Sequence, residues 1–203
     1  MHQLEVFADV ACPFTHVGLR LFRRLREERG AAEPLLRVRA WPLEVVNDTG
    51  LDGSALAPKI EALRAGVAPD LFAGFDPSTF PSSTLEAMAS EGAAYGVSAD
   101  VGERFALAVR DALFERGLDV GDADVLAAVR DEVGAPEPSD DDRAAVRADH
   151  EEGRGRGVSG SPHFFTPAGD FFCPSLAIEH PDGGLEVHFD EAGYRRFVDA
   201  AFA

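Results

Sequence analysis

The strongest constraint on the fold is a short apolar strand that leads directly into a helix begun by proline. Residues 4–8 have strand character, and Asp9-Val10-Ala11 connects them to Cys12-Pro13, where helical spacing begins. Proline suits the first helical position because the N–H that it lacks would have no intrahelical partner there. The helical spacing ends at Gly30. In residues 36–41 apolar and charged residues then alternate with period two. This pattern predicts a strand, a helix and a second strand.

The middle of the chain, residues 56–155, has the spacing and the Pro and Gly punctuation of several helices. Ser83 with Glu86 predicts a capping box, Asp122 predicts a helix start, and Ser139 precedes three Asp residues that favour a helix N-terminus. The three Asp residues alone also suggest a carboxylate metal site, but the turn glycine and glutamate of such a site are missing. We therefore predict a helical insertion and no metal.

The C-terminal part has the pattern of a hairpin followed by a helix. His163-Phe164-Phe165 and Phe171-Phe172-Cys173 read as two strands joined by a Pro-Ala-Gly-Asp turn, and Asp190 is placed to cap a helix. The predicted order is βαβ, helices, ββα, an α/β fold. We expect the two halves of this fold at residues 1–55 and 156–203, with the helical insertion at 56–155.

Charge and cysteine content limit the partners and the compartment. A formal net charge of −17 disfavours nucleic acid and anionic membrane surfaces as partners. The first ten residues lack the basic and apolar segments of a secretory signal, and no apolar run approaches a spanning length of about 18 residues. With two cysteines in 203 residues, a structural disulfide framework is not expected. We expect a cytoplasmic protein.

Cys12 is the first candidate for chemistry, because it follows a strand and stands at the start of a helix. Unpaired N–H groups and the helix dipole favour a thiolate at that place, and the thiolate is the nucleophilic form of cysteine. This argument predicts a pKa below that of a free cysteine. The alternative is that Cys12 is a small buried apolar residue.

The segment from Asp9 to Gly18 resembles the active-site sequence of DsbA-like proteins, in particular the FrnE-like branch, whose members commonly read Cys-Pro-Trp-Cys-Tyr-Ile-Gly there. Trp41-Pro42-Leu43-Glu44 and the segment from Gly157 to Phe164 extend the resemblance. It implies a thioredoxin fold with an inserted all-helical domain and a cis peptide bond before Pro162. It also implies that Ser161 offers backbone hydrogen bonds to an extended peptide or a small thiol.

Thr15 stands where this family has its second cysteine, so the dithiol is missing. A hydroxyl cannot attack a mixed disulfide, but Thr15 can donate a hydrogen bond to the Cys12 thiolate or bond to local backbone. The layout is also similar to kappa-class glutathione transferases and 2-hydroxychromene-2-carboxylate isomerases, which usually have Ser-Pro in place of Cys12-Pro13. In those enzymes the hydroxyl activates a bound glutathione thiol.

The candidate site residues surround these two elements. We expect Cys12, Thr15 and Pro162 to be catalytic, and substrate to contact five neighbours: Pro13, Phe14, His16, Ser161 and His163. The two histidines either tune the thiolate and move a proton, or are an exposed helix residue and a residue that begins a strand. Cys173 is the candidate second thiol, because hairpin geometry returns it to the Pro162 end; its alternative is a small packed residue.

Three functions remain open. The first is a thiol-disulfide oxidoreductase that uses Cys12 in a monothiol cycle on a protein or small-molecule disulfide. The second is a transferase or isomerase that depends on glutathione or an equivalent thiol, and the third is a redox sensor or binding protein without turnover. No tightly bound cofactor is expected, although a low-molecular-weight thiol is a candidate co-substrate. The oligomeric state is left open by the sequence.

Overall fold

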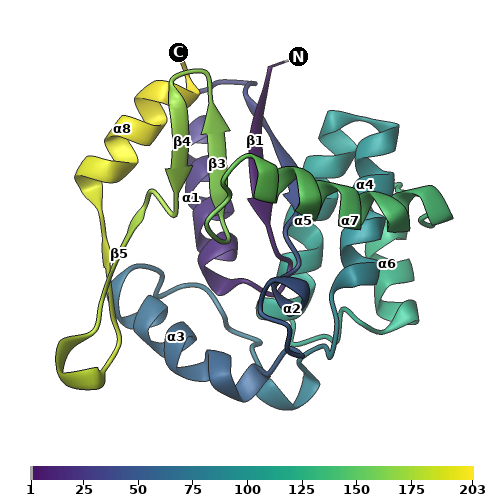
Figure 1. The fold of residues 1–203 in the computed structure, drawn as a ribbon, viewed down its shortest axis with the longest axis horizontal. Coiled ribbons are helices and arrows are strands. Elements are labelled where there is room, and N and C mark those ends of the chain that lie inside the picture. Colours follow the sequence, from purple (N-terminus) through teal and green to yellow (C-terminus); the bar gives the residue numbers. More distant parts are fainter. Residues whose placement is uncertain (1) are drawn as a thin grey trace.

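The computed structural model describes residues 2–203 and has a four-stranded sheet at its centre (Figure 1). The strand order is β2-β1-β3-β4, with the ranges Leu35–Ala40, Gln3–Ala8, His163–Thr166 and Gly169–Phe172. β1 is parallel to β2 and antiparallel to β3, so that Val6 lies opposite Val38 on one side and Phe164 on the other. Helix α1 (Pro13–Glu28) connects β1 to β2. Both ends of the chain therefore build one sheet, as predicted.

Side chains pack against both faces of β1. Successive residues of a strand point to opposite faces, so Val6 and Phe7 take part in different clusters. Val6 belongs to a buried cluster that includes Phe22 of α1 and Phe197 of α8 (Glu191–Ala201). Phe7 points to the opposite face and packs edge-on against Trp41, with ring centroids 6.5 Å apart. Neither Val6 nor Phe7 has exposed surface. The central strand is thus a rigid support for the loop that follows it.

Six α-helices separate β2 from β3 in the chain: a short α2 (Leu43–Val46), followed by α3 (Gly53–Gly66), α4 (Leu85–Val97), α5 (Ala99–Phe114), α6 (Ala123–Val133) and α7 (Asp140–Gly155). Helix α5 packs against both β2 and α1. A buried ion pair strengthens this contact, since the Arg26 guanidinium donates to both oxygens of Glu103 at 2.6 Å. Glu103 also accepts the Leu36 N–H at 2.8 Å. The helices and the sheet thus share buried polar contacts.

Tyr95 of α4 makes a second connection to β2. Its hydroxyl accepts the Val38 N–H at 3.0 Å and donates to the Leu36 carbonyl at 2.9 Å. The ring covers Gly102 so closely that an added Cβ there would lie 2.0 Å from the Tyr95 ring. The small residue at 102 therefore allows α4 and α5 to approach.

Three of the four predicted helix caps are confirmed. Asp122 accepts N–H groups at the start of α6, Ser139 forms a capping box with Asp142 at α7, and Asp190 accepts the Gly193 N–H at α8. The capping box predicted from Ser83 and Glu86 is wrong. The Ser83 hydroxyl donates to Glu44 instead, while Glu86 pairs with Arg143, and α4 begins only at Leu85. Contacts distant in sequence outweigh the local pattern there.

Two elements were not predicted from the sequence. A four-residue helix α2 (Leu43–Val46) follows β2, and a two-stranded ribbon of β5 (Leu176–Glu179) and β6 (Glu186–Phe189) precedes α8. The ribbon packs on α3, where an added Cβ at Gly66 would lie 1.8 Å from the Val187 carbonyl oxygen. Two one-turn 3₁₀ segments, η1 (Pro77–Thr79) and η2 (Pro181–Gly183), complete the elements. None of the helices in the described range is long and apolar enough to cross a bilayer.

Candidate active site

Cys12 lies between the end of β1 and the start of α1, in the strand-to-helix loop that the sequence predicted. It is the N-cap residue, with φ −83° and ψ 114°, and Pro13 occupies the first helical position. The carbonyl oxygen of Cys12 accepts the first helical hydrogen bond, from the His16 N–H at 3.1 Å. Cys12 is thus one residue before the helix, with its side chain at the positive end of the helix dipole.

The loop before β3 faces Cys12. The Ser161–Pro162 peptide bond is cis, the geometry that the family resemblance implies. The Cys12 thiol donates a hydrogen bond to the Ser161 carbonyl oxygen, with 3.1 Å between Sγ and oxygen. Pro162 also packs on α1, where an added Cβ at Gly18 would lie 3.6 Å from the proline ring. Two segments about 150 residues apart in the sequence thus form one buried site.

Thr15 completes this contact as a hydroxyl in the place of a second thiol. Its Oγ1 lies 2.8 Å from the Ser161 Oγ, in a hydrogen bond for which either atom can be the donor. The Ser161 Oγ also accepts the Asp9 N–H at 2.9 Å. Both Thr15 and Ser161 are buried. The four residues therefore form a continuous polar chain around the Cys12 sulfur.

Comparison with known proteins identifies the arrangement. Residues 3–180 match the DSBA-like thioredoxin domain, which is most of the chain. This chain belongs to the family of DSBA-like thioredoxin domains. The match is to the family as a whole, so the FrnE-like branch stays a prediction. A search of curated proteins gives no match.

Solved structures with the same fold include those of a disulfide reductase and an isomerase. Cytosolic disulfide reductase DsbM from Pseudomonas aeruginosa superposes with a TM-score of 0.62 at 15% identity over 97% of each chain. The same reductase with GSH gives 0.61 at 15% identity, also over 97% of each chain. A 2-hydroxychromene-2-carboxylate isomerase gives 0.62 at 16% identity, over 84% of this chain and 88% of that one. At these identities the similarity establishes the fold, and function must be argued from the site.

Burial has the largest effect on the pKa of the Cys12 thiol in this DSBA-like domain. The side chain is 3% exposed, and desolvation raises the pKa of the Cys12 thiol above its ordinary value. Hydrogen bonds from Ser161 and Thr15 lower the pKa, and the negative charge of Asp9 raises it again. The expectation of a lowered pKa is therefore wrong for this closed arrangement. The helix N-terminus is present, but burial outweighs it.

Asp9 is a site residue that the sequence reasoning missed. Its carboxyl group is fully buried next to Cys12, and burial raises the pKa of Asp9 to about 6. Three hydrogen-bond donors and the Arg110 charge lower the pKa but do not cancel the effect of burial. The signal in the sequence is an acid between the apolar strand and Val10-Ala11, in a loop where a buried charge needs partners. Those partners come from distant segments.

The two candidate histidines are both buried, so the alternative in which His16 is an exposed helix residue is wrong. His16 packs against the rings of Phe72 and Phe114, which also contact each other, and it hydrogen-bonds through Nε2 to Glu115 at 2.7 Å. Burial lowers the pKa of His16 despite that carboxylate. The groups that shift the Cys12 thiol are Ser161, Thr15 and Asp9, and neither histidine is among them.

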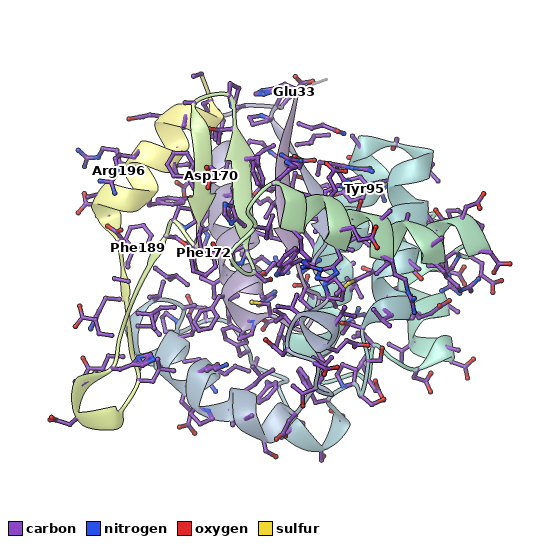
Figure 2. The ribbon with its side chains drawn as sticks, in the orientation of Figure 1. Glu33, Tyr95, Asp170, Phe172, Phe189 and Arg196 are labelled. Atoms are coloured by element: carbon purple, nitrogen blue, oxygen red, sulfur yellow. The ribbon has the colours of Figure 1, made fainter. Side chains whose placement is uncertain are left out.

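His163 begins β3 with both ring nitrogens engaged. Nδ1 accepts the Ser159 N–H at 3.1 Å, so Nε2 carries the proton and donates to Asp170 at 2.8 Å. Asp170 and Phe172 belong to β4 at the edge of the sheet (Figure 2). His163 therefore joins the two strands of the hairpin and holds the end of the Ser161 loop.

Cys173 lies where the hairpin argument placed it. It directly follows β4, and its N–H donates to the Pro162 carbonyl oxygen at 3.0 Å. It is a buried free thiol, and burial together with the nearby Cys12 raises the pKa of Cys173 to about 12. Its φ of 46° places the backbone in the left-handed region, within a tight turn into β5. Cys12 and Cys173 are thus electrostatic neighbours, and both are free thiols.

A cavity of about 320 Å³ opens beside the Cys12 loop. Ala11 forms part of its wall, together with Leu43 of α2, Lys59 of α3 and Phe80. A larger cavity of about 570 Å³ lies on the other side of α2, against α7. Only the smaller cavity has a wall residue next to Cys12 in the chain. Within residues 2–203 no group of three or more His, Cys, Asp or Glu is arranged to hold a metal.

Proposed function

We propose that this DSBA-like domain is a monothiol thiol-disulfide oxidoreductase of the cytoplasm, with Cys12 as its nucleophile. The observation that carries the proposal is the contact of the Cys12 sulfur with the Ser161 carbonyl, 3.1 Å away, beside a threonine hydroxyl. A thioredoxin-fold site with one thiol in this position can start disulfide exchange but cannot finish it alone. An external thiol must complete the cycle, and the reducing cytoplasm provides such thiols.

The proposed cycle has two exchange steps. The Cys12 thiol gives up its proton, and the thiolate attacks one sulfur of a substrate disulfide, which forms a mixed disulfide and releases the other sulfur as a thiolate. A second, external thiolate then attacks the sulfur of the mixed disulfide that belongs to the substrate. A new external disulfide leaves, and Cys12 is regenerated as a thiolate that takes up a proton. Each step breaks one S–S bond and forms one.

The neighbouring residues have distinct roles in this proposal. Ser161 offers its backbone to the substrate once the thiol no longer donates to its carbonyl. Pro13 is buried at the first helical position, so the partly exposed Phe14 is the residue after Cys12 that substrate can contact. Thr15 donates to the thiolate as it forms. The substrate enters through the cavity beside Ala11, where Lys59 provides a positive charge for the carboxylate of a small thiol. Glutathione is a suitable probe, since GSH accompanies the DsbM structure.

The first test is intact-mass analysis after incubation of the folded protein with oxidised glutathione. We expect one glutathione adduct on Cys12, removed by reduced glutathione, and none in Cys12→Ser. Cys173→Ser should form the same adduct if Cys173 takes no part. A Cys12–Cys173 disulfide in peptide maps would replace the monothiol cycle by an intramolecular one. Absence of both products would overturn the proposal.

A second candidate is a glutathione-dependent transferase or isomerase, favoured by the cavity next to Cys12. Its volume of about 320 Å³ falls within the range for small-ligand sites. Such an enzyme would hold reduced glutathione as a stoichiometric ligand without forming a disulfide. Calorimetric titration of Cys12→Ser with reduced glutathione separates the two, because tight binding is expected only for the transferase or isomerase.

A further inference from the structure

The Asp9 carboxyl group joins three segments that begin around the active site. Its Oδ1 accepts the Ala11 N–H at 2.7 Å and the Thr84 hydroxyl at 3.0 Å, and its Oδ2 accepts the Leu43 N–H at 2.6 Å. Ala11 precedes Cys12, Leu43 begins α2, and Thr84 precedes α4. One buried side chain thus fixes the loop of Cys12 relative to two helices.

The backbone of Asp9 makes hydrogen bonds to Ser161 and to Cys12, the two residues in contact at the site. Its N–H donates to the Ser161 Oγ at 2.9 Å, and its carbonyl oxygen accepts the Cys12 N–H at 3.5 Å. Ser161 is in turn the acceptor of the Cys12 thiol. A change at Asp9 is therefore transmitted to the sulfur through the loop on either side.

The charges around Asp9 do not neutralise it. From α5, the Arg110 guanidinium reaches the Asp9 carbonyl at 3.4 Å, but it also pairs with Glu91 of α4 at 2.7 Å. From α2, Glu44 accepts the Thr84 N–H and adds a further negative charge. From the start of α1, the facing ionisable group is the Cys12 thiol itself. A second negative charge at Cys12 is therefore opposed by Asp9.

We propose that Asp9 is the positioning residue of this site: its carboxyl group holds the Cys12 loop against Ser161, and its charge controls how readily the Cys12 thiolate forms. The inference deepens the proposed function, because it rests on Cys12 being the nucleophile. The two Asp9 oxygens are occupied by N–H and hydroxyl donors, so Asp9 acts through the loop and its charge and is not the base that removes the thiol proton. Its ionisation near pH 6 supports this role.

The test is the rate of iodoacetamide alkylation of Cys12, measured from pH 4 to 10 by peptide mass spectrometry. In the wild-type protein we expect the rise of log rate with pH to flatten near pH 6, where Asp9 becomes charged. In Asp9→Asn that step should be missing, and the rate at pH 7 should increase by about threefold or more, because the opposing charge is gone. Alkylation needs no disulfide, so it is independent of the glutathione adduct.

A second variant keeps the test valid if Asp9→Asn does not fold. Thr84→Val removes one hydroxyl from the Asp9 carboxylate, so the step should move upward by about one pH unit. Ser83→Ala is the matched control, since the neighbouring hydroxyl binds Glu44 and should leave the profile unchanged. Profiles of folded Asp9→Asn and Thr84→Val that coincide with wild type would overturn the inference. A rate lowered equally at every pH would make Asp9 a purely structural residue.

Discussion

Replacement of Arg110 by methionine tests how much the helices and the active-site loop depend on one buried charge. Arg110 has no exposed surface; it pairs with Glu91 at 2.7 Å and donates to the Ala106 carbonyl at 2.7 Å. Its loss leaves the Glu91 carboxylate, 1% exposed, without its cation. Breaking a buried pair in this way costs about 3–5 kcal/mol of unfolding free energy. That is a large fraction of the about 5–15 kcal/mol typical of a domain.

Urea unfolding followed by the fluorescence of Trp41, the single tryptophan, measures this loss. Arg104→Met on the same helix is the control, because the Arg104–Asp100 pair is exposed and should contribute less than about 1 kcal/mol. The double variant Arg110→Met with Glu91→Met should recover most of the stability, since no charge is left buried. The reasoning is refuted if Arg110→Met costs no more than Arg104→Met, or if the double variant is less stable than the single one.

Three further outcomes are expected. Thr15→Cys should raise insulin reduction by about tenfold or more, because an internal thiol resolves the mixed disulfide; an unchanged rate would speak against disulfide exchange. In urea unfolding, Gly102→Ala should lower the free energy of unfolding by about 1–3 kcal/mol, because the added Cβ meets the Tyr95 ring. Gly92→Ala has open space around the added Cβ and should raise this free energy by up to about 1 kcal/mol. Equal changes in the two variants would contradict this. Burial raises the pKa of Asp9 from 3.8 to about 6, so the folded state holds this proton more tightly than the unfolded chain. The stability from Asp9 is therefore present below pH 4 and lost as the pH rises to 6, by about 3 kcal/mol; Asp9→Asn should lack that decline, and parallel pH curves for the two proteins would refute it.

The local sequence was sufficient to predict features that depend on interactions between residues close in the chain. Proline after Cys12 predicted the start of α1, and the caps at Asp122 and Ser139 form because donor and acceptor lie within three residues of each other. The position of Cys173 beside Pro162 followed from the geometry of a hairpin. The cis bond came from the family resemblance, because a local sequence rarely specifies it.

Local sequence failed where distant residues decide the energy. The helix-dipole argument predicted a lowered pKa for Cys12, but burial in the folded chain raises it, and the Cys12 thiol there contacts Ser161, which is 149 residues away. The role of Asp9 depends on Thr84 and Arg110, which no spacing rule connects to it. The strands β5 and β6 were missed because each has only four residues and a single buried side chain, so the alternation of apolar and polar residues is weak.

The polar contacts of α4 and α5 with the sheet have a consequence for how such a chain can evolve. Glu103 is bound by Arg26 and by the backbone of β2, and the Tyr95 hydroxyl is shared by two backbone groups of the same strand. Excision of the segment between β2 and β3 would leave the Arg26 guanidinium facing an empty site. Recombination between relatives therefore cannot exchange the inserted helices as an independent unit. A viable chimera would have to carry the matching strand along with its helices.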